Sequence, residues 1–238
     1  MTKAVIVQAR MTSTRLPGKV LMELGGTTVL DHVLTRCAAI PGIDKVCCAI
    51  PEGDRHDAVA AEAERCGAVV VRGAELDVLD RYHHAAQSLR ASVVMRVTSD
   101  CPLIDPGLCG EVLAMLLADD TADYAANNFS HRYPHGLDCE AFRSDALARA
   151  WNEATDDYDR EHVTPWLRRA SGIHRLSLGG PNPELGKLRW TLDFPEDLEF
   201  CRALFARLGP GIPPWTETLK ICSAHPELET LNAVHRQR

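Results

Sequence analysis

The first half of the chain alternates short apolar runs with segments of helical spacing, and this alternation repeats four times. The apolar runs are residues 3–7, 46–50, 68–71 and 92–97, and the helical segments are residues 28–37, 54–66, 76–89 and 106–118. Runs of Val and Ile without polar alternation are typical of strands covered on both faces. The order therefore predicts an α/β fold with a mostly parallel central sheet, helices on both faces and right-handed crossovers.

The second half is less regular, and residues 129–142 show only weak periodicity. We expect strands at 123–128, 173–178 and 188–192, and helices at 146–156, 160–170, 195–208 and 215–223. We interpret residues 1–238 as a single domain in which residues 131–170 form an inserted segment for acceptor binding or dimerisation.

Composition limits the partners and the compartment. The formal net charge is −7, which argues against binding to nucleic acid or to an anionic membrane. The nine cysteines include no CxxC pair and several lie in apolar runs, so we expect them to be reduced and mostly buried. No charged-then-apolar leader and no run of about 20 apolar residues is present. We expect a cytoplasmic protein.

The loop that follows the first predicted strand is rich in cations and hydrogen-bond donors. Residues 8–19 contain Arg10, Arg15 and Lys19 together with three hydroxyl side chains, and they contain no Asp or Glu. A polyanion such as a triphosphate is the simplest ligand for such a loop. The loop is not a Walker A motif, because residue 13 is Ser and residue 20 is Val. The GxGxxG pattern of NAD and FAD proteins is also absent.

Polar loops at residues 8–19, 72–81 and 98–105 each follow a predicted parallel strand. The carboxyl ends of parallel strands share one edge of a sheet, so we expect a common site there. Asp100 and Asp193 also end predicted strands, and Mg²⁺ needs only one or two carboxylates beside phosphate oxygens. Each aspartate could instead cap the helix that follows it.

Five motifs carry a family resemblance: QARMTSTRLPGKVL, RVTSDCPLIDP, YPHGLDCEAF, REHVTPW and LRWTLDFPEDLE. In this order they resemble the cytidylyltransferase family that includes the SpsF-type spore coat polysaccharide proteins. That family is related to the CMP-acylneuraminate, CMP-pseudaminate and CMP-Kdo synthetases. The resemblance implies the nucleotide-diphospho-sugar transferase fold, which is a GT-A Rossmann-like fold. It also implies CTP as the donor, Mg²⁺ as the cofactor and pyrophosphate as a product.

The resemblance also implies roles for single residues. Lys19, Arg15 and Asp100 would be catalytic, and Asp100 and Asp193 would hold the metal. Nucleotide binding is expected from Ala9, Arg10, Ser13, Arg15, Lys19, Arg72, Gly73, Asp80, Arg81 and Thr98. The Kdo enzymes have a Gly-Asp pair followed by an acidic residue where this chain has Ser99-Asp100-Cys101, which leaves the acceptor open.

The acceptor side is expected between residues 131 and 162. The candidate acceptor residues are Tyr133, Gly136, Asp138, Glu140, Arg160 and His162. The alternative is that this acidic and histidine-rich segment only supports a dimer contact. The spacing of His131, His135 and His162 does not favour a zinc site.

The sequence thus predicts a Mg²⁺-dependent cytidylyltransferase that acts on CTP and on a sugar acid or a phosphorylated small molecule, as a homodimer. Two alternatives stay open. One is a GT-A glycosyltransferase, although Ser99-Asp100-Cys101 is not the DxD motif that such enzymes usually carry. The other is a nucleotide-binding relative without catalytic activity.

Overall fold

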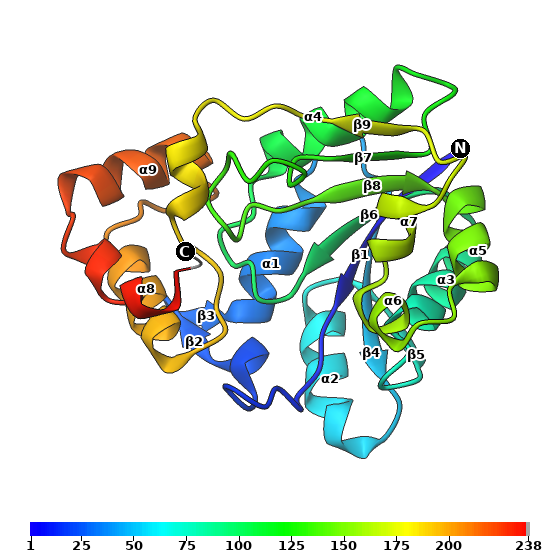
Figure 1. Ribbon diagram of the computed structural model, residues 1–238. Coiled ribbons are helices and arrows are strands. Elements are labelled where there is room, and N and C mark those ends of the chain that lie inside the picture. The colour runs from blue at the N-terminus through cyan, green and yellow to red at the C-terminus, as the bar shows by residue number, and fades with distance from the viewer. Residues whose placement is uncertain (237–238) are drawn as a thin grey trace.

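A seven-stranded sheet crosses the centre of the protein, as Figure 1 shows for the computed structural model, which describes residues 1–236. The strand order is β5-β4-β1-β6-β8-β7-β9, and β8 is antiparallel to both of its neighbours while the other pairs are parallel. The mostly parallel sheet predicted from the sequence is confirmed. The strands are β1 (Thr2–Gln8), β4 (Lys45–Pro51), β5 (Val69–Gly73), β6 (Ala91–Thr98), β7 (Tyr124–Ala126), β8 (Glu140–Arg143) and β9 (Arg175–Ser177).

Helices cover both faces of this sheet. They are α1 (Val29–Ala38), α2 (Asp57–Arg65), α3 (Val78–Leu89), α4 (Pro106–Leu117), α5 (Ser144–Glu153), α6 (Asp157–His162), α7 (Pro165–Arg169), α8 (Pro195–Phe205) and α9 (Trp215–Ala224). Side chains of α1, α2 and α4 pack on one face, and those of α3, α5 and α7 pack on the other. Within the described chain, no helix combines the length and the apolar composition that a membrane crossing requires.

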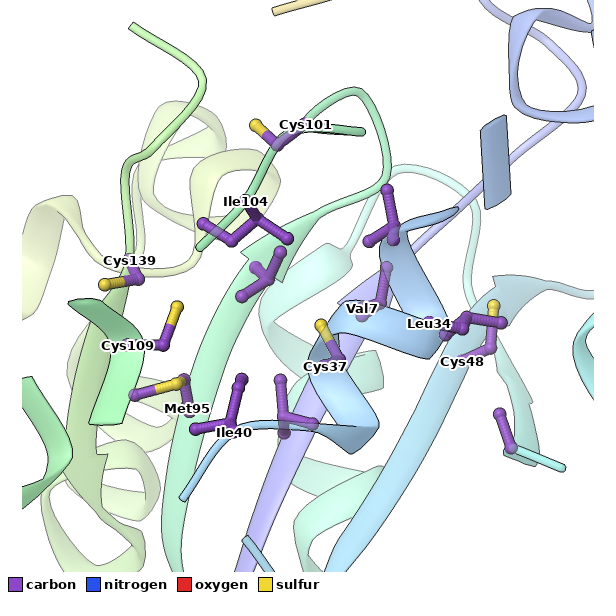
Figure 2. Packing of buried hydrophobic residues seen from close by; sticks show 14 of the residues in the cluster. Val7, Leu34, Cys37, Ile40, Cys48, Met95, Cys101, Ile104, Cys109 and Cys139 are labelled. Atoms are coloured by element: carbon purple, nitrogen blue, oxygen red, sulfur yellow. The ribbon is translucent and has the colours of Figure 1, made fainter. Parts of the chain in front are cut away.

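Alternating residues of β1 divide the core between the two faces. Val5 and Val7 point into the α1 side, whereas Ala4 and Ile6 point into the α3 side. Figure 2 shows the α1 side, where Cys37, Cys48 and other sulfur-bearing side chains pack beside aliphatic ones. All nine cysteines are free thiols, and all except Cys66 are buried, as the sequence predicted for most of them.

The C-terminal elements form a third cluster beside the first helix. Side chains of α8 and α9 pack with Trp190, Leu192 and the short hairpin of β2 (Glu23–Leu24) and β3 (Thr27–Thr28). This cluster holds residues 188–193 close to the carboxyl end of β6, since Leu192 N–H donates to the Asp100 carbonyl at 2.8 Å. The packing therefore brings two segments that are far apart in sequence to one edge of the sheet.

Two predicted elements differ from the observed ones, and one observed strand was not predicted. Residues 188–192 make one isolated bridge, from Arg189 to His135, and form no strand because they run between two loops. The predicted helix 160–170 is split into α6 and α7 at Val163, whose φ is 71°, just before Pro165. The strand β8 was not predicted because its first residue is the charged Glu140, which is buried.

Gly136 allows the loop after Tyr133 to cross residues 190–191 closely. Its φ is +114°, and a Cβ added there would lie 2.7 Å from both Thr191 N and Trp190 C. We expect Gly136→Ala to lower the free energy of unfolding by about 1–3 kcal/mol, through backbone strain and this overlap. Urea denaturation would measure the loss. Gly179→Ala is the matched control, because no atom lies within 4 Å of its added Cβ, and equal stability of the two variants would contradict the prediction.

Candidate active site

Lys19 connects three segments at the carboxyl edge of the sheet. Its Nζ donates to Asp193 Oδ1 at 2.7 Å, to the Leu192 carbonyl at 2.8 Å and to Asp100 Oδ2 at 3.3 Å. The side chain is brought back to this edge by Gly18, whose φ of 70° and whose N–H bond to the Met11 carbonyl close the loop. The three donor positions of the ammonium group are thus all used by oxygen atoms of the protein.

The charges of this cluster support one another. Burial alone would raise the pKa of Asp100, but the Lys19 ammonium and a hydrogen bond from Thr98 Oγ1 at 2.5 Å outweigh it and lower the pKa to about 2. Burial alone would lower the pKa of Lys19, and the negative charges of Asp100 and Asp193 reverse this and raise it. Lys19 and Asp100 are therefore both charged at neutral pH.

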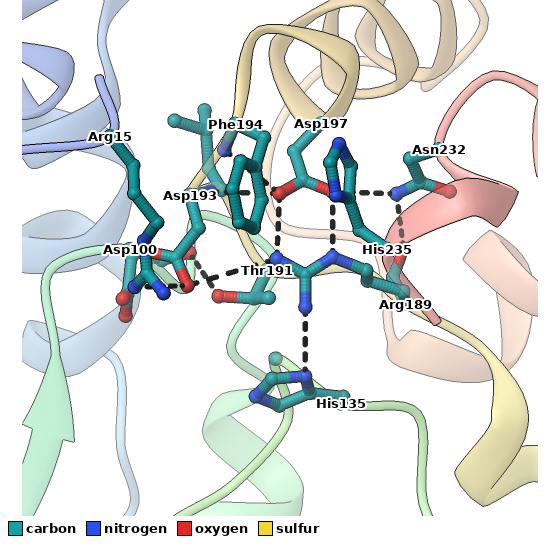
Figure 3. A network of polar contacts seen from close by, with 12 residues as sticks. Arg15, Asp100, His135, Arg189, Thr191, Asp193, Phe194, Asp197, Asn232 and His235 are labelled. Atoms are coloured by element: carbon teal, nitrogen blue, oxygen red, sulfur yellow. Dashed lines mark hydrogen bonds and ion pairs between the residues drawn. The ribbon is translucent and has the colours of Figure 1, made fainter. Parts of the chain in front are cut away.

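Asp193 is held from its backbone as well as from its side chain. Arg15 Nη2 lies 3.0 Å from its Oδ2. Its N–H donates to Asp197 Oδ2 at 2.9 Å, and Asp197 in turn is fully buried in a two-pronged ion pair with Arg189. Figure 3 shows this network; α8 begins at Pro195, two residues after Asp193.

Two cavities meet at this cluster. The smaller has a volume of about 290 Å³ and the larger about 440 Å³, and Arg96, Thr98 and Asp100 line both. Arg96 begins the RVTSDCPLIDP motif but was not a candidate site residue in the sequence analysis. Arg96 lies two residues before Thr98 in β6, so the two side chains share one face of the strand, and this spacing is the signal that would have identified it.

The smaller cavity collects most of the expected nucleotide residues. Its walls include Ala9, Arg10, Ser13, Arg15, Lys19, Arg81 and Thr98, together with Asp193, Glu161 and His162. Three expected residues lie outside it. Arg72 pairs with Asp57 at 2.6 Å, Asp80 accepts a hydrogen bond from Trp151 Nε1 at 2.8 Å, and Gly73 makes room for Arg81.

The larger cavity contains only part of the expected acceptor set. Tyr133, Asp138 and Glu140 line it, next to Asn128, His131, His135, Lys187, Leu188, Arg189, Thr191 and Arg236. Burial raises the pKa of Asp138. Arg160 lies outside both cavities because it pairs with Asp77 at 2.6 Å, and His162 lines the smaller cavity instead.

Glu140 is a buried anchor whose oxygens are all engaged. It accepts hydrogen bonds from Arg96 at 2.7 Å, from Thr164 at 3.0 Å and from Tyr124, and it pairs with Arg168 at 3.3 Å. These contacts outweigh the effect of burial and lower its pKa. Its carboxylate therefore positions Arg96 in the wall between the two cavities.

The pair Asp100 and Asp193 offers the donors that a hard divalent cation requires. Both are carboxylates, and they converge on one cationic group, the Lys19 ammonium. Among residues 1–236, one group of three or more His, Cys, Asp or Glu side chains has metal-ligand spacing, namely Asp31, Glu62 and Cys66. Arg65 already pairs with both acidic groups of that cluster. Asp100 and Asp193 also carry cationic partners, but they line the smaller cavity beside Arg10, Arg15 and Lys19, so they are the candidate ligands for a divalent metal that accompanies a phosphate group.

Comparisons with known proteins find similarity to cytidylyltransferases in both sequence and structure. Residues 4–207 match the family model described as cytidylyltransferase. The chain is 31% identical over 234 residues to the spore coat polysaccharide biosynthesis protein SpsF of Bacillus subtilis, covering 94% of this chain and 95% of that protein. It is 37% identical over 247 residues to 3-deoxy-manno-octulosonate cytidylyltransferase of Bradyrhizobium diazoefficiens, covering 97% and 96%. A solved cytidylyltransferase structure from Leptospira borgpetersenii has a TM-score of 0.92 at 26% identity, covering 96% of this chain and 97% of that one.

The low pKa of Asp100 makes a prediction about stability at acid pH. Its pKa of about 2 in the folded state lies below the ordinary value of 3.8, so the unfolded state binds the proton more readily. This contribution, about 2 kcal/mol, is fully present above pH 4 and is lost as the pH falls through 2. We expect the difference in unfolding free energy between wild type and Asp100→Asn to shrink by that amount from pH 6 to pH 2, measured by urea denaturation.

Asp120→Asn is the control for this measurement, because the Asp120 side chain is fully exposed. Its difference from wild type should stay nearly constant over the same range. A difference for Asp100→Asn that does not change with pH would show that Lys19 does not keep Asp100 ionised.

Proposed function

Because the chain belongs to the cytidylyltransferase family, we propose that it transfers CMP from CTP to a sugar acid or a related phosphorylated acceptor, with release of pyrophosphate. The family resemblance of the sequence motifs, and the nucleotide-diphospho-sugar transferase fold expected with it, are confirmed by the matches above. In this proposal the product serves surface polysaccharide or glycoconjugate synthesis, and the enzyme works in the cytoplasm as a homodimer.

The observation that carries the proposal is the position of the Lys19–Asp100–Asp193 cluster. It lies where a cavity lined by Arg10, Arg15 and Lys19 joins a second, larger cavity. A group-transfer enzyme needs this arrangement, since the two substrates must meet at one reacting atom. We assign the smaller cavity to CTP, whose triphosphate matches its cations, and the larger cavity to the acceptor.

The reaction is an in-line displacement at the α-phosphorus. An acceptor oxygen forms a bond to the α-phosphorus, and the bond from that phosphorus to the bridging oxygen of the departing pyrophosphate breaks. Negative charge builds up on the leaving group, and the Arg15 and Lys19 side chains neutralise it. Lys19 suits this role because its raised pKa keeps the ammonium group protonated throughout the neutral range.

Asp100 and Asp193 would hold Mg²⁺, which when bound supplies positive charge to the phosphates and increases the acidity of an attacking hydroxyl group. Thr98 keeps Asp100 oriented through its hydroxyl hydrogen bond. Asp197 keeps the backbone of Asp193 in place by accepting a hydrogen bond from its N–H. Both carboxylates are thus fixed before any ligand arrives.

The larger cavity suits a polar acceptor that carries an acidic group. Tyr133, His135 and Asp138 offer hydrogen-bond donors and acceptors, as sugar hydroxyl groups require. Arg96 and Lys187 also line this cavity and carry positive charge. These side chains support a sugar acid or a sugar phosphate as the acceptor class.

The proposal predicts that pyrophosphate is released from CTP faster than from ATP, GTP or UTP. The screen would combine each nucleoside triphosphate with a panel of sugar acids and sugar phosphates, in the presence of Mg²⁺. Removal of Mg²⁺ with EDTA should stop the release. Consumption of a nucleotide sugar without pyrophosphate release would instead indicate a glycosyltransferase, and CTP binding without turnover on any acceptor would indicate a non-catalytic relative.

Substitutions at the cluster test the roles of its members. Asp100→Ala should abolish turnover and leave the far-UV circular dichroism spectrum unchanged, because the metal loses one of its two carboxylates. Lys19→Ala should reduce kcat by about tenfold to a thousandfold, the usual effect of losing one charge stabiliser. Lys220→Ala is the control, since this lysine is exposed and pairs with Glu217 on the surface of α9. An active, Mg²⁺-dependent Asp100→Ala enzyme would contradict the metal assignment.

A further inference from the structure

The last described residues of the chain fold back onto the candidate active site. The family match ends at residue 207, two residues after the end of α8. Beyond it, α9 and two short 3-10 turns, Leu228–Thr230 and Ala233–His235, lead the chain towards the start of α8 (Figure 1). Residues 232–236 lie there beside Arg189, Phe194 and Asp197. We call residues 232–236 the C-terminal segment.

Asn232 completes the hydrogen bonding of the buried ion pair behind Asp193. Its Nδ2 donates to the Arg189 carbonyl at 2.9 Å and to Asp197 Oδ1 at 3.0 Å, and the residue is fully buried. The other oxygen of Asp197 accepts the backbone N–H groups of Asp193 and Phe194, at 2.9 and 3.1 Å. Asn232 therefore acts on the Asp193 backbone through one intervening carboxylate.

The ring of His235 stacks on the ring of Phe194, which is the residue after Asp193. The two rings are stacked with centroids 3.8 Å apart and an angle of 4° between their planes. His235 is itself tied to Glu196 by a 2.9 Å hydrogen bond. The Arg15 guanidinium lies 5.1 Å from the centroid of Phe194, and Figure 3 shows the ring between Arg15 and His235. The segment thus also supports the cation that contacts Asp193.

Arg236 brings the segment to the cavity itself. It lines the larger cavity, and its guanidinium is anchored to Glu229 by a 2.7 Å hydrogen bond to the carbonyl and by a side-chain ion pair. Glu229 also accepts a hydrogen bond from Trp190 Nε1. The C-terminal segment therefore contacts the site through three residues: Asn232 at the Arg189–Asp197 pair, His235 at Phe194, and Arg236 at the larger cavity.

We propose that the C-terminal segment is a structural part of the active site, in which Asn232 and His235 are positioning residues that hold Asp193 where it binds the divalent metal. The proposal rests on the function proposed above, because it takes Asp193 as a metal ligand. Groups that orient a metal ligand through hydrogen bonds usually change metal affinity by about ten- to a hundredfold when they are lost. Loss of Asn232 should therefore weaken metal binding even when the protein remains folded.

The test measures Mn²⁺ affinity by the enhancement of water-proton relaxation, with CTP present and acceptor absent. Asn232→Leu has a similar volume but lacks the donor, and we expect it to weaken Mn²⁺ binding by about ten- to a hundredfold. His235→Ala loses the stacking contact with Phe194 and the hydrogen bond to Glu196, neither of which reaches Asp193 directly, so we expect a weakening of about two- to tenfold. Val234→Ala is the matched control in the same segment, because Val234 is 76% exposed, and it should behave like wild type.

His235→Ala also covers the case in which Asn232→Leu fails to fold, since the His235 side chain is only partly buried. Circular dichroism at the assay temperature identifies the folded variants. A folded Asn232→Leu protein, or a folded His235→Ala protein, with wild-type Mn²⁺ affinity would overturn the proposal, as would a wild type that binds no Mn²⁺. Normal Mn²⁺ binding by wild type without pyrophosphate release would instead refute the proposed function and leave the positioning result valid.

Discussion

The structure depends on a single buried ammonium group that is shared by two carboxylates. Lys19 joins the loop after β1 to the end of β6 and to the segment before α8, which are 81 and 174 residues away in sequence. A buried charge is stable only when it is paired and hydrogen-bonded, so these three segments must assemble together. The same requirement brings the two candidate metal ligands to one point. The cluster that holds the carboxyl edge together is therefore also the cluster that provides its chemistry.

A second buried charge cluster surrounds Glu140 and supports the first. Glu140 binds Arg96 and Arg168 from neighbouring elements, and Arg96 stands in the wall between the two cavities. A third cluster is formed by Arg189 and Asp197, and Asp197 accepts a hydrogen bond from the Asp193 backbone N–H. Several residues that looked like ligand-binding groups therefore serve as supports. Arg160 is an example, because Asp77 already satisfies its guanidinium.

Sequence reasoning succeeded where a local signal was strong. The excess of cations in residues 8–19 identified Lys19, and the alternation of apolar runs with helical spacing identified the four parallel strands. It was wrong where a contact distant in sequence decides the structure. Residues 188–192 were predicted as a strand, yet their hydrogen-bonding partners are loops. The strand β8 begins with a charge, and only the cations packed around Glu140 make a strand possible there.

The sequence by itself determined the βα order, the cation-rich loop and the two aspartates, since these depend on residue type and spacing along the chain. The family of the chain also followed from its motifs. Only the tertiary structure decided that Arg96 lines both cavities and that Arg72 and Arg160 lie outside them. It also decided that Asn232 hydrogen-bonds Asp197, the residue that holds the Asp193 backbone. The physical reason is that each of these side chains must neutralise or hydrogen-bond a partner, and the fold alone determines which partner lies within reach.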